Sequence, residues 1–312
     1  MEIVELAPQV FACLQKDEGL GCSTSGFVRG EGGVVIDTFW DLAHTKQLKA
    51  LYAGVSAAPV RRVVNTHRNG DHCWGNQLFE GAEIIGHRLA AEHFHREQPE
   101  MMQMLRNATD SPDPRAAAMA RRLQRFDFSG IVPTPPTTLV EDRLELDVGG
   151  IVVHLIYVGP AHTAGDLLVH LPAERVVFAG DVLFRLCTPI GWEGTTARWC
   201  AALDAIVELD PAVIVPGHGP LCGLEGPREL RAYLEYVRSE ASSFFAQGID
   251  EFEASRRIDP GPYASWTEPE RLVFNVARVY RELRGEPWDA PIPMGRLFSA
   301  MAELGARPHR HG

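Results

Sequence analysis

Four short segments of the chain carry histidines and aspartates at spacings that suit a metal site. They supply four histidines and two aspartates, and they read Asn65-Thr66-His67-Arg68-Asn69-Gly70-Asp71-His72, Gly159-Pro160-Ala161-His162, Ala179-Gly180-Asp181 and Pro216-Gly217-His218-Gly219. This donor set suits a divalent ion, with zinc as the first choice and iron or manganese as alternatives. Each segment follows an apolar run typical of a strand, so we expect each ligand on a loop at a strand end. Together the four segments predict one metal centre.

Such a centre favours hydrolysis. A bound divalent ion lowers the pKa of water toward ~7 and polarises a carbonyl oxygen. Asp71, beside the ion, can accept a proton and return it as the tetrahedral intermediate collapses. The expected reaction is therefore hydrolysis of an activated acyl bond, such as that of a thioester, lactone or lactam.

The order of these ligands closely resembles the metallo-β-lactamase superfamily. Its motif HxHxDH, followed by His, Asp and His, is matched by residues 67–72, His162, Asp181 and His218. The resemblance covers roughly residues 5–222. It implies an α/β fold, a four-layer αββα sandwich with the metal site at one sheet edge. The flanking residues are most similar to the branch of hydroxyacylglutathione hydrolase-like enzymes and aromatic polyketide thioesterase-cyclases.

By this resemblance the ligands form two neighbouring sites that share one carboxylate. The first site comprises His67, position 69 and His162, the second comprises Asp71, His72 and His218, and the bridge is Asp181. Position 69 departs from the family, because Asn69 stands where the motif has a histidine. An amide nitrogen has no useful lone pair, so only the neutral oxygen of Asn69 could coordinate. We expect one or two bound ions, with the tighter binding at the second site.

The elements that must position these residues come in two batches of predicted strands, each followed by helix. This order predicts two sheets packed face to face with helices outside. Residues 1–224 are expected to form the metallo-β-lactamase-like domain, with a helical insertion at about 88–135. Residues 225–312 read as a helical C-terminal extension packed on the same domain.

The composition excludes some classes of partner. A formal net charge of -11 argues against a nucleic-acid surface, which needs clustered Lys and Arg. No apolar run reaches the length of about eighteen residues that a membrane span requires, and no secretory signal is apparent. Six cysteines without a CxxC pair favour free thiols in a reducing cytoplasm. We therefore expect a cytoplasmic protein, with a homodimer as one possible assembly.

Several large or basic side chains near the motifs are candidates for a substrate pocket. They are the aromatic residues Trp40, Trp74, Phe184 and Trp192 and the basic residues Arg68 and Arg185. Packing in the core explains the aromatic residues equally well, and a solvated or structural role is the alternative for the two arginines. The apolar insertion and tail, which also bear Met and aromatic residues, predict a medium-sized, partly hydrophobic small molecule, either free or bound to a carrier protein or CoA.

Three functions follow from these residues. The leading one is a metal-dependent hydrolase of a thioester or lactone-type ester. The second is a non-hydrolytic metal enzyme, either a polyketide cyclase-like enzyme or an iron oxygenase. The third is a metal-binding or ligand-binding protein that has lost hydrolysis through Asn69.

Overall fold

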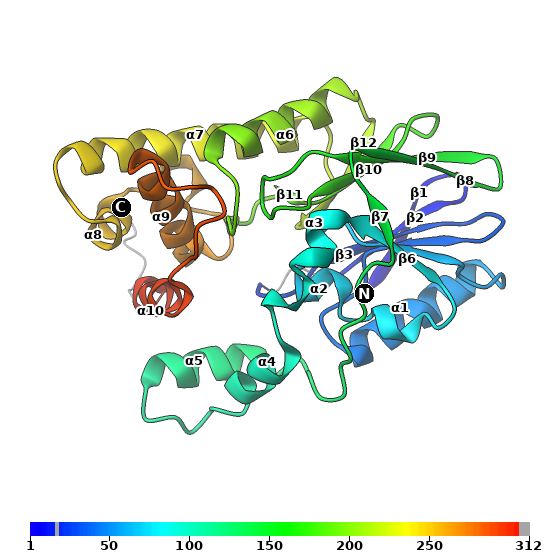
Figure 1. The fold of residues 1–312 in the computed structure, drawn as a ribbon, viewed down its shortest axis with the longest axis horizontal. Coiled ribbons are helices and arrows are strands. Elements are labelled where there is room, and N and C mark those ends of the chain that lie inside the picture. Colours follow the sequence, from blue (N-terminus) through cyan, green and yellow to red (C-terminus); the bar gives the residue numbers. More distant parts are fainter. Residues whose placement is uncertain (16–18, 306–312) are drawn as a thin grey trace.

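Two β-sheets packed face to face form the centre of the molecule (Figure 1). The computed structural model describes residues 1–15 and 19–305. The first sheet has seven strands in the order β1 (Glu2–Ala7), β2 (Val10–Leu14), β3 (Thr24–Val28), β4 (Val34–Ile36), β5 (Arg62–Val64), β6 (Glu83–His87) and β7 (Thr138–Val140). The second sheet has five, in the order β12 (Val213–His218), β11 (Val176–Phe184), β10 (Leu167–Leu171), β9 (Ile151–Tyr157) and β8 (Arg143–Val148).

Apolar side chains of both sheets meet in a core between them. Val34 and Ile36 of β4 lie in this cluster with Val153 and Leu155 of β9, and Phe178 of β11 is buried beside them. In β9 the inward residues alternate with less buried ones, as the two-residue period of a strand requires. The predicted pair of packed sheets is confirmed.

Parallel pairing explains why the metal motifs gather at one edge. Strands β4, β5, β6 and β7 pair in parallel, and so do β11 and β12. The carboxyl ends of parallel neighbours point the same way, so the segments that follow β5 and end β12 reach one edge. That edge faces the insertion and the C-terminal helices (Figure 1).

The expectation that every ligand lies on a loop is wrong for four of them. His218 is the last residue of β12. Asp181 lies inside β11, because this strand resumes pairing with β12 after an irregularity at Gly180, whose φ is +49°. Asp71 and His72 lie on the short helix α2 (Gly70–Cys73), which is followed by the 3₁₀ turn η1 (Asn76–Leu78).

Helices cover the outer faces of both sheets. Helix α1 (Leu42–Val55) begins at the capping residue Asp41 and buries Leu48 and Tyr52 against the first sheet. Helix α6 (Thr196–Glu208) begins at Thr195, whose side chain accepts a hydrogen bond from the backbone N–H of Arg198, and α6 packs on the second sheet. The sheets and these helices give the predicted αββα layers.

The insertion leaves the sheets after β6 and returns at β7. It contains α3 (Arg88–Glu92), η2 (Phe94–Arg96), α4 (Pro99–Arg106) and α5 (Pro114–Leu123). Helices α4 and α5 form a hairpin that extends below the body of the molecule in Figure 1. The segment Ser111-Pro112-Asp113 lies between them, and Pro114 begins α5.

The C-terminal helices share a core with the second sheet. They are α7 (Glu225–Ala246), α8 (Glu251–Arg257), the turns η3 (Gly261–Tyr263) and η4 (Pro269–Arg271), α9 (Leu272–Leu283) and α10 (Met294–Gly305). Trp199 and Leu203 of α6 pack in one cluster with Leu234 of α7 and Val276 of α9. The division of the chain at residue 224 stays a prediction.

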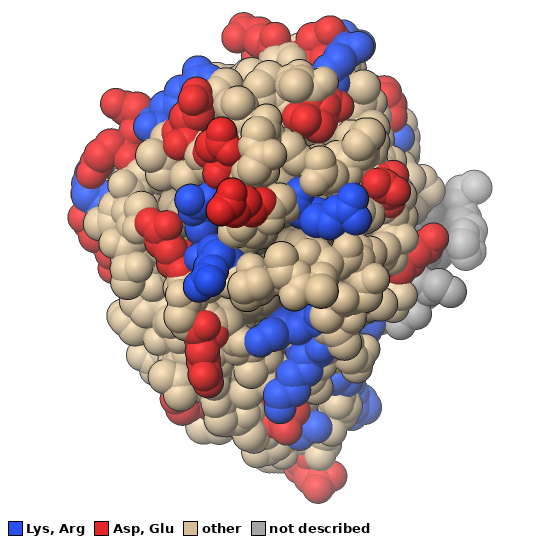
Figure 2. Space-filling view, turned by 90° about the vertical axis from the view of Figure 1, so that its right-hand side faces the viewer, with Lys and Arg blue, Asp and Glu red and all other residues tan. Residues whose placement is uncertain are grey.

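Charged residues of both signs are mixed on the face in Figure 2, where Lys and Arg stand among Asp and Glu.

No helix among the described residues has the length and apolar character needed to cross a membrane.

Candidate metal centre

The six predicted ligands come together around Asp181. Its Oδ1 lies 3.1 Å from Nε2 of His72 and 3.4 Å from Nε2 of His218. Its Oδ2 lies 3.3 Å from Nε2 of His162 and 3.8 Å from Nε2 of His67. Each oxygen of this buried carboxylate therefore faces a different pair of imidazoles, as a bridge between two ions requires.

The donor atoms fit a metal in each half of the centre. One group is His67, His162 and Asp181, a second is Asp71, His72 and His218, and within each group the donor atoms lie within 4.8 Å of one another. A third group, Asp37, His67 and His72, overlaps both. His67 Nε2, His72 Nε2 and Asp181 Oδ1 are buried without a hydrogen-bond partner. Buried polar atoms are seldom left unpaired, so their convergence indicates room for cations.

Three of the histidines are oriented through their other ring nitrogen. The Nδ1 contacts are those of His72 with Asp37 Oδ2 at 2.9 Å, His162 with the Ile190 carbonyl at 2.6 Å and His218 with the Cys22 carbonyl at 3.0 Å. A carbonyl or carboxylate there accepts the Nδ1 proton and leaves Nε2 free to bind metal. Thr24 Oγ1 donates to the carbonyl of Pro216, which fastens β3 to the His218 segment.

Asp37 was missed by the sequence reasoning. Its Oδ1 accepts the backbone N–H of Thr66 at 2.7 Å, so it holds the first motif as well as His72. The available signal was its position directly after the apolar run Val34–Ile36, the same signal that marks the ligands.

Ionised carboxylates give this centre negative charge, which favours the binding of cations. Burial opposes ionisation of Asp181, but His218 and His72 outweigh it and hold its pKa well below the usual range. Burial likewise opposes protonation of His218, yet Asp181 raises the pKa of His218 to about 10. Burial lowers the pKa of His162 to about 4, so this imidazole is neutral at neutral pH. Neutral imidazole is the form that binds metal.

Asn69 turns its oxygen toward the first half of the centre. Its Oδ1 lies 2.8 Å from Nε2 of His162, while its Nδ2 donates to Glu97 of the insertion. The oxygen of the amide is therefore the end of Asn69 that faces His162, and its part in binding metal stays a prediction. Glu97 was not predicted, because nothing in its local sequence marks it.

Asp166 holds the loop that carries His162. Its carboxylate accepts the backbone N–H groups of Ala161 and Thr163 and the hydroxyl of Thr163. Burial raises the pKa of Asp166 to about 7 in spite of these donors. The loop is therefore organised by one buried side chain.

Asp166→Ala is expected to lower the free energy of unfolding by about 1–3 kcal/mol, because buried donors lose their acceptor. This corresponds to roughly 2–4 °C in Tm per kcal/mol for a domain of 150–250 residues, measured by circular dichroism. Asp289→Ala, a change at an exposed carboxyl, is the matched control. Equal Tm values for the two variants would contradict this role.

The aromatic candidates occupy two different surroundings. Trp40 and Trp74 pack with Phe126 and Phe128 in a buried cluster beneath the insertion, with ring centroids 4.9 Å apart for Trp40 and Phe126. The other two candidates lie at the ligands. Phe184 stacks on His218 at 5.1 Å, and the ring of Trp192 lies 6.5 Å from that of His162. Their part in binding substrate stays a prediction.

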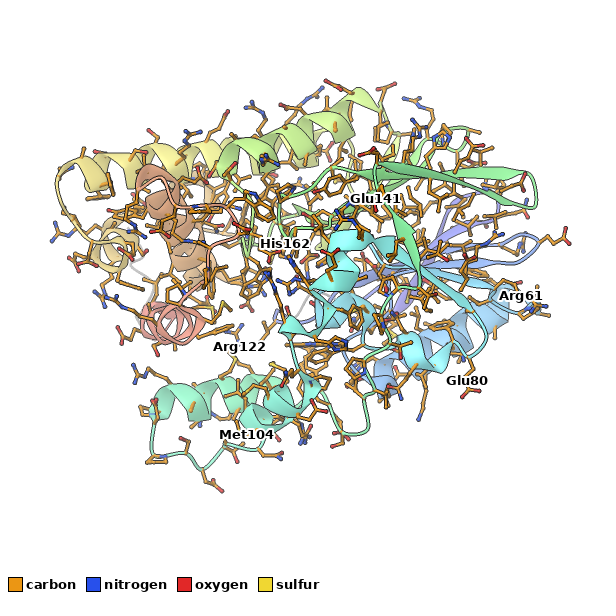
Figure 3. All side chains as sticks on the ribbon, in the orientation of Figure 1. Arg61, Glu80, Met104, Arg122, Glu141 and His162 are labelled. Atoms are coloured by element: carbon orange, nitrogen blue, oxygen red, sulfur yellow. The ribbon has the colours of Figure 1, made fainter. Side chains whose placement is uncertain are left out.

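Both arginine candidates are engaged in ion pairs. Arg68 is 6% exposed and lies between Glu97 and Glu193, with its Nη1 3.3 Å from Oε1 of Glu97. Arg185 pairs with Glu229 of α7. Figure 3 shows His162 at the junction of the sheets, the insertion and the C-terminal helices. Both arginines were predicted to lie near the centre, but the glutamates that pair with them were not predicted.

The sequence model described as "Metallo-beta-lactamase superfamily" matches residues 19–218. The 2,4-dinitroanisole O-demethylase subunit alpha of Nocardioides sp. (strain JS1661) is 28% identical over 196 residues, which cover 61% of this chain and 51% of that protein. The hydroxyacylglutathione hydrolase of Maricaulis maris (strain MCS10) is 26% identical over 231 residues, 73% of this chain and 62% of that protein. The chain thus spans about half to three fifths of these relatives.

Among solved structures, the sec-alkylsulfatase Pisa1 from Pseudomonas sp. superposes with a TM-score of 0.64 at 18% sequence identity. The match covers 94% of this chain and 51% of that structure. It therefore extends beyond the two sheets into the C-terminal helices.

Proposed function

Because this chain belongs to the metallo-β-lactamase superfamily, we propose that it is a metal-dependent hydrolase of an activated acyl bond, a thioester or a lactone-type ester. One observation carries the proposal: two groups of His and Asp donors meet at Asp181, whose oxygens each face one pair of imidazoles, and several of the buried donor atoms have no partner. The likeness to a hydroxyacylglutathione hydrolase supports an acyl substrate.

A divalent ion, with zinc as the first choice and iron or manganese as alternatives, would supply Lewis acidity and lower the pKa of water toward ~7. His67, His162 and Asp181 would hold one ion, and Asp71, His72 and His218 would hold the other beside the shared carboxylate. Asp71 is the more exposed of the two carboxylates, with 16% of its side chain accessible against 5% for Asp181. Its carboxylate is therefore the better placed of the two to take a proton and return it to the leaving group.

The insertion and the C-terminal helices enclose the metal edge. Arg122 of α5 pairs with Glu268 and Glu270 near η4, and α5 contacts α10 (Figure 3). Trp192, next to the His162 segment, packs with Phe298 of α10. An apolar wall beside the ligands supports a medium-sized, partly apolar small molecule, free or carried on CoA or a carrier protein.

The test begins with metal quantification on the purified protein. A panel of thioesters, lactones and β-lactams then follows with the metal found, together with an alkyl sulfate and an aryl methyl ether chosen from the names of the relatives. We expect turnover of a thioester or lactone that stops on treatment with a chelator and returns with the metal. Metal-loaded protein that turns over only the sulfate or the ether would contradict an acyl substrate.

One further assay separates the cyclase-like alternative from hydrolysis. Ring closure of an acyl-carrier-bound polyketide would identify a cyclase-like enzyme instead of a hydrolase. Five of the cysteines are unbridged thiols, which supports a reducing compartment such as the cytoplasm as the place where the protein acts; they are Cys13, Cys73, Cys187, Cys200 and Cys222.

A further inference from the structure

Glu97 joins the insertion to the first metal motif. It lies between η2 and α4, and its Oε1 accepts a hydrogen bond from Nδ2 of Asn69. Its Oε2 accepts the backbone N–H of Gly70 at 3.1 Å, at the start of α2. One carboxylate of the insertion therefore fixes both the side chain at position 69 and the backbone that follows it.

This contact decides which end of the Asn69 amide faces the ligands. With Nδ2 directed at Glu97, Oδ1 points to Nε2 of His162 at 2.8 Å. The Ile190 carbonyl, 2.6 Å from Nδ1 of His162, can only accept, so Nδ1 carries the proton of the neutral ring. Lone pairs of Oδ1 and Nε2 then face one small volume, and a cation between them stabilises the arrangement.

We propose that Glu97 is a positioning residue that makes Asn69 the oxygen donor of the first metal site. The inference rests on the metal centre of the proposed function. With Asn69 oriented in this way, each site has two imidazoles and two oxygen donors, one of them from the shared Asp181. The asparagine then replaces an imidazole donor with an oxygen donor and leaves the number of donors unchanged.

Glu97 is itself held in place by an ionic network. Arg68 lies between it and Glu193, with Nη2 3.7 Å from Oε1 of Glu193. Glu193 also pairs with Arg96 and accepts the backbone N–H of Ala164 at 2.6 Å. The network thus joins the insertion, the first motif and the His162 loop, so the Glu97 carboxylate has a defined orientation.

Glu97→Ala is expected to weaken the first site about 10- to 100-fold, the usual cost of removing a residue that orients a metal ligand. Affinity for the second ion should change little, because Glu97 accepts no hydrogen bond from Asp71, His72 or His218 and reaches α2 only through the backbone N–H of Gly70. Competition with a chromophoric chelator, with Zn²⁺ or Co²⁺ as the probe, measures both affinities. Glu100→Ala, at an exposed carboxyl on α4, is the matched control and should leave both affinities unchanged.

Glu97→Gln should give an intermediate loss. The two donors meet different oxygens of Glu97, and glutamine replaces one of these oxygens with an NH2 group. That NH2 would face either Asn69 Nδ2 or the Gly70 N–H, donor against donor.

The sign of the effect of Glu97→Ala on first-site affinity distinguishes a positioning role of Glu97 from a merely structural one. In an Asn69→Asp background the carboxylate ligand needs no orientation, and Glu97 repels it. Glu97→Ala should therefore raise first-site affinity in that background and lower it in the native one. In an Asn69→Ala background it should have no effect on that site.

Each contrary result has a distinct meaning. Loss of affinity at both sites, or the same loss in all three backgrounds, would overturn the positioning role while leaving the metal centre intact. Protein that binds neither ion would overturn the proposed function together with this inference.

Discussion

Asp181→Ala is expected to abolish retention of both ions, and all turnover with them. Its two oxygens face different pairs of imidazoles, so one substitution removes a donor from each site. Loss of a residue that only orients a ligand costs about 10- to 100-fold in affinity, and loss of a bridging ligand should exceed about 100-fold at both sites. Metal content after dialysis against a mild chelator measures the effect.

Two single-site variants serve as controls for Asp181. His67→Ala removes a donor that belongs to the first group alone, and His218→Ala removes one that belongs to the second. Each should lose one ion and keep the other. If Asp181→Ala protein kept one equivalent of metal, the shared carboxylate would not be the bridge.

The second large effect concerns proton transfer. Asp71→Asn keeps an oxygen near the second ion but cannot take up a proton, so kcat should fall about 10²- to 10⁴-fold. Metal content is measured in parallel, because the assignment requires that the second ion stays bound. Unchanged kcat in metal-loaded Asp71→Asn protein would remove Asp71 from the reaction.

The pH profile gives an independent check on Asp71. Burial opposes its ionisation, but His72 and His218 outweigh burial and lower the pKa of Asp71 below its ordinary value. The ionised form therefore persists at neutral pH and is lost only when the pH falls through that lowered pKa. Native kcat/KM should decline in acid, and this acidic limb should be absent in Asp71→Asn.

Some ligands of the site could be predicted because their position in the sequence, at the end of an apolar run, is informative on its own. His67 and His162 follow apolar strands and His218 ends one, and a ligand at the end of a strand is visible without knowledge of its neighbours. The two sheets follow from the same runs. Asp181 was identified as a ligand but placed on a loop, because an irregular parallel pairing with β12 cannot be seen within β11 itself.

The remaining contacts depend on tertiary structure. Glu97 is 28 residues from Asn69, and Glu193 is 97 residues from Arg96, so only the folded insertion brings them together. Trp74 lies beside the motif in sequence, yet its surroundings are set by Phe128 from the far end of the insertion. Residue type and local spacing therefore give the ligands but not the residues that orient them.

The hydrogen bonds that join residues 22–24 to the His218 segment bear on the stage of folding at which a metal could bind. His218 Nδ1 meets the Cys22 carbonyl across 196 positions, and Thr24 meets Pro216 across 192. A nascent chain that has not yet reached residue 218 therefore has no second site, however long its amino-terminal part has been outside the ribosome. An ion held by Asp71, His72 and His218 would therefore be captured only after both sheets have been synthesised, and its binding would be coupled to the final docking of the strands. The identity of such an ion would then reflect the metal pool in which folding ends as well as the chemistry of the ligands.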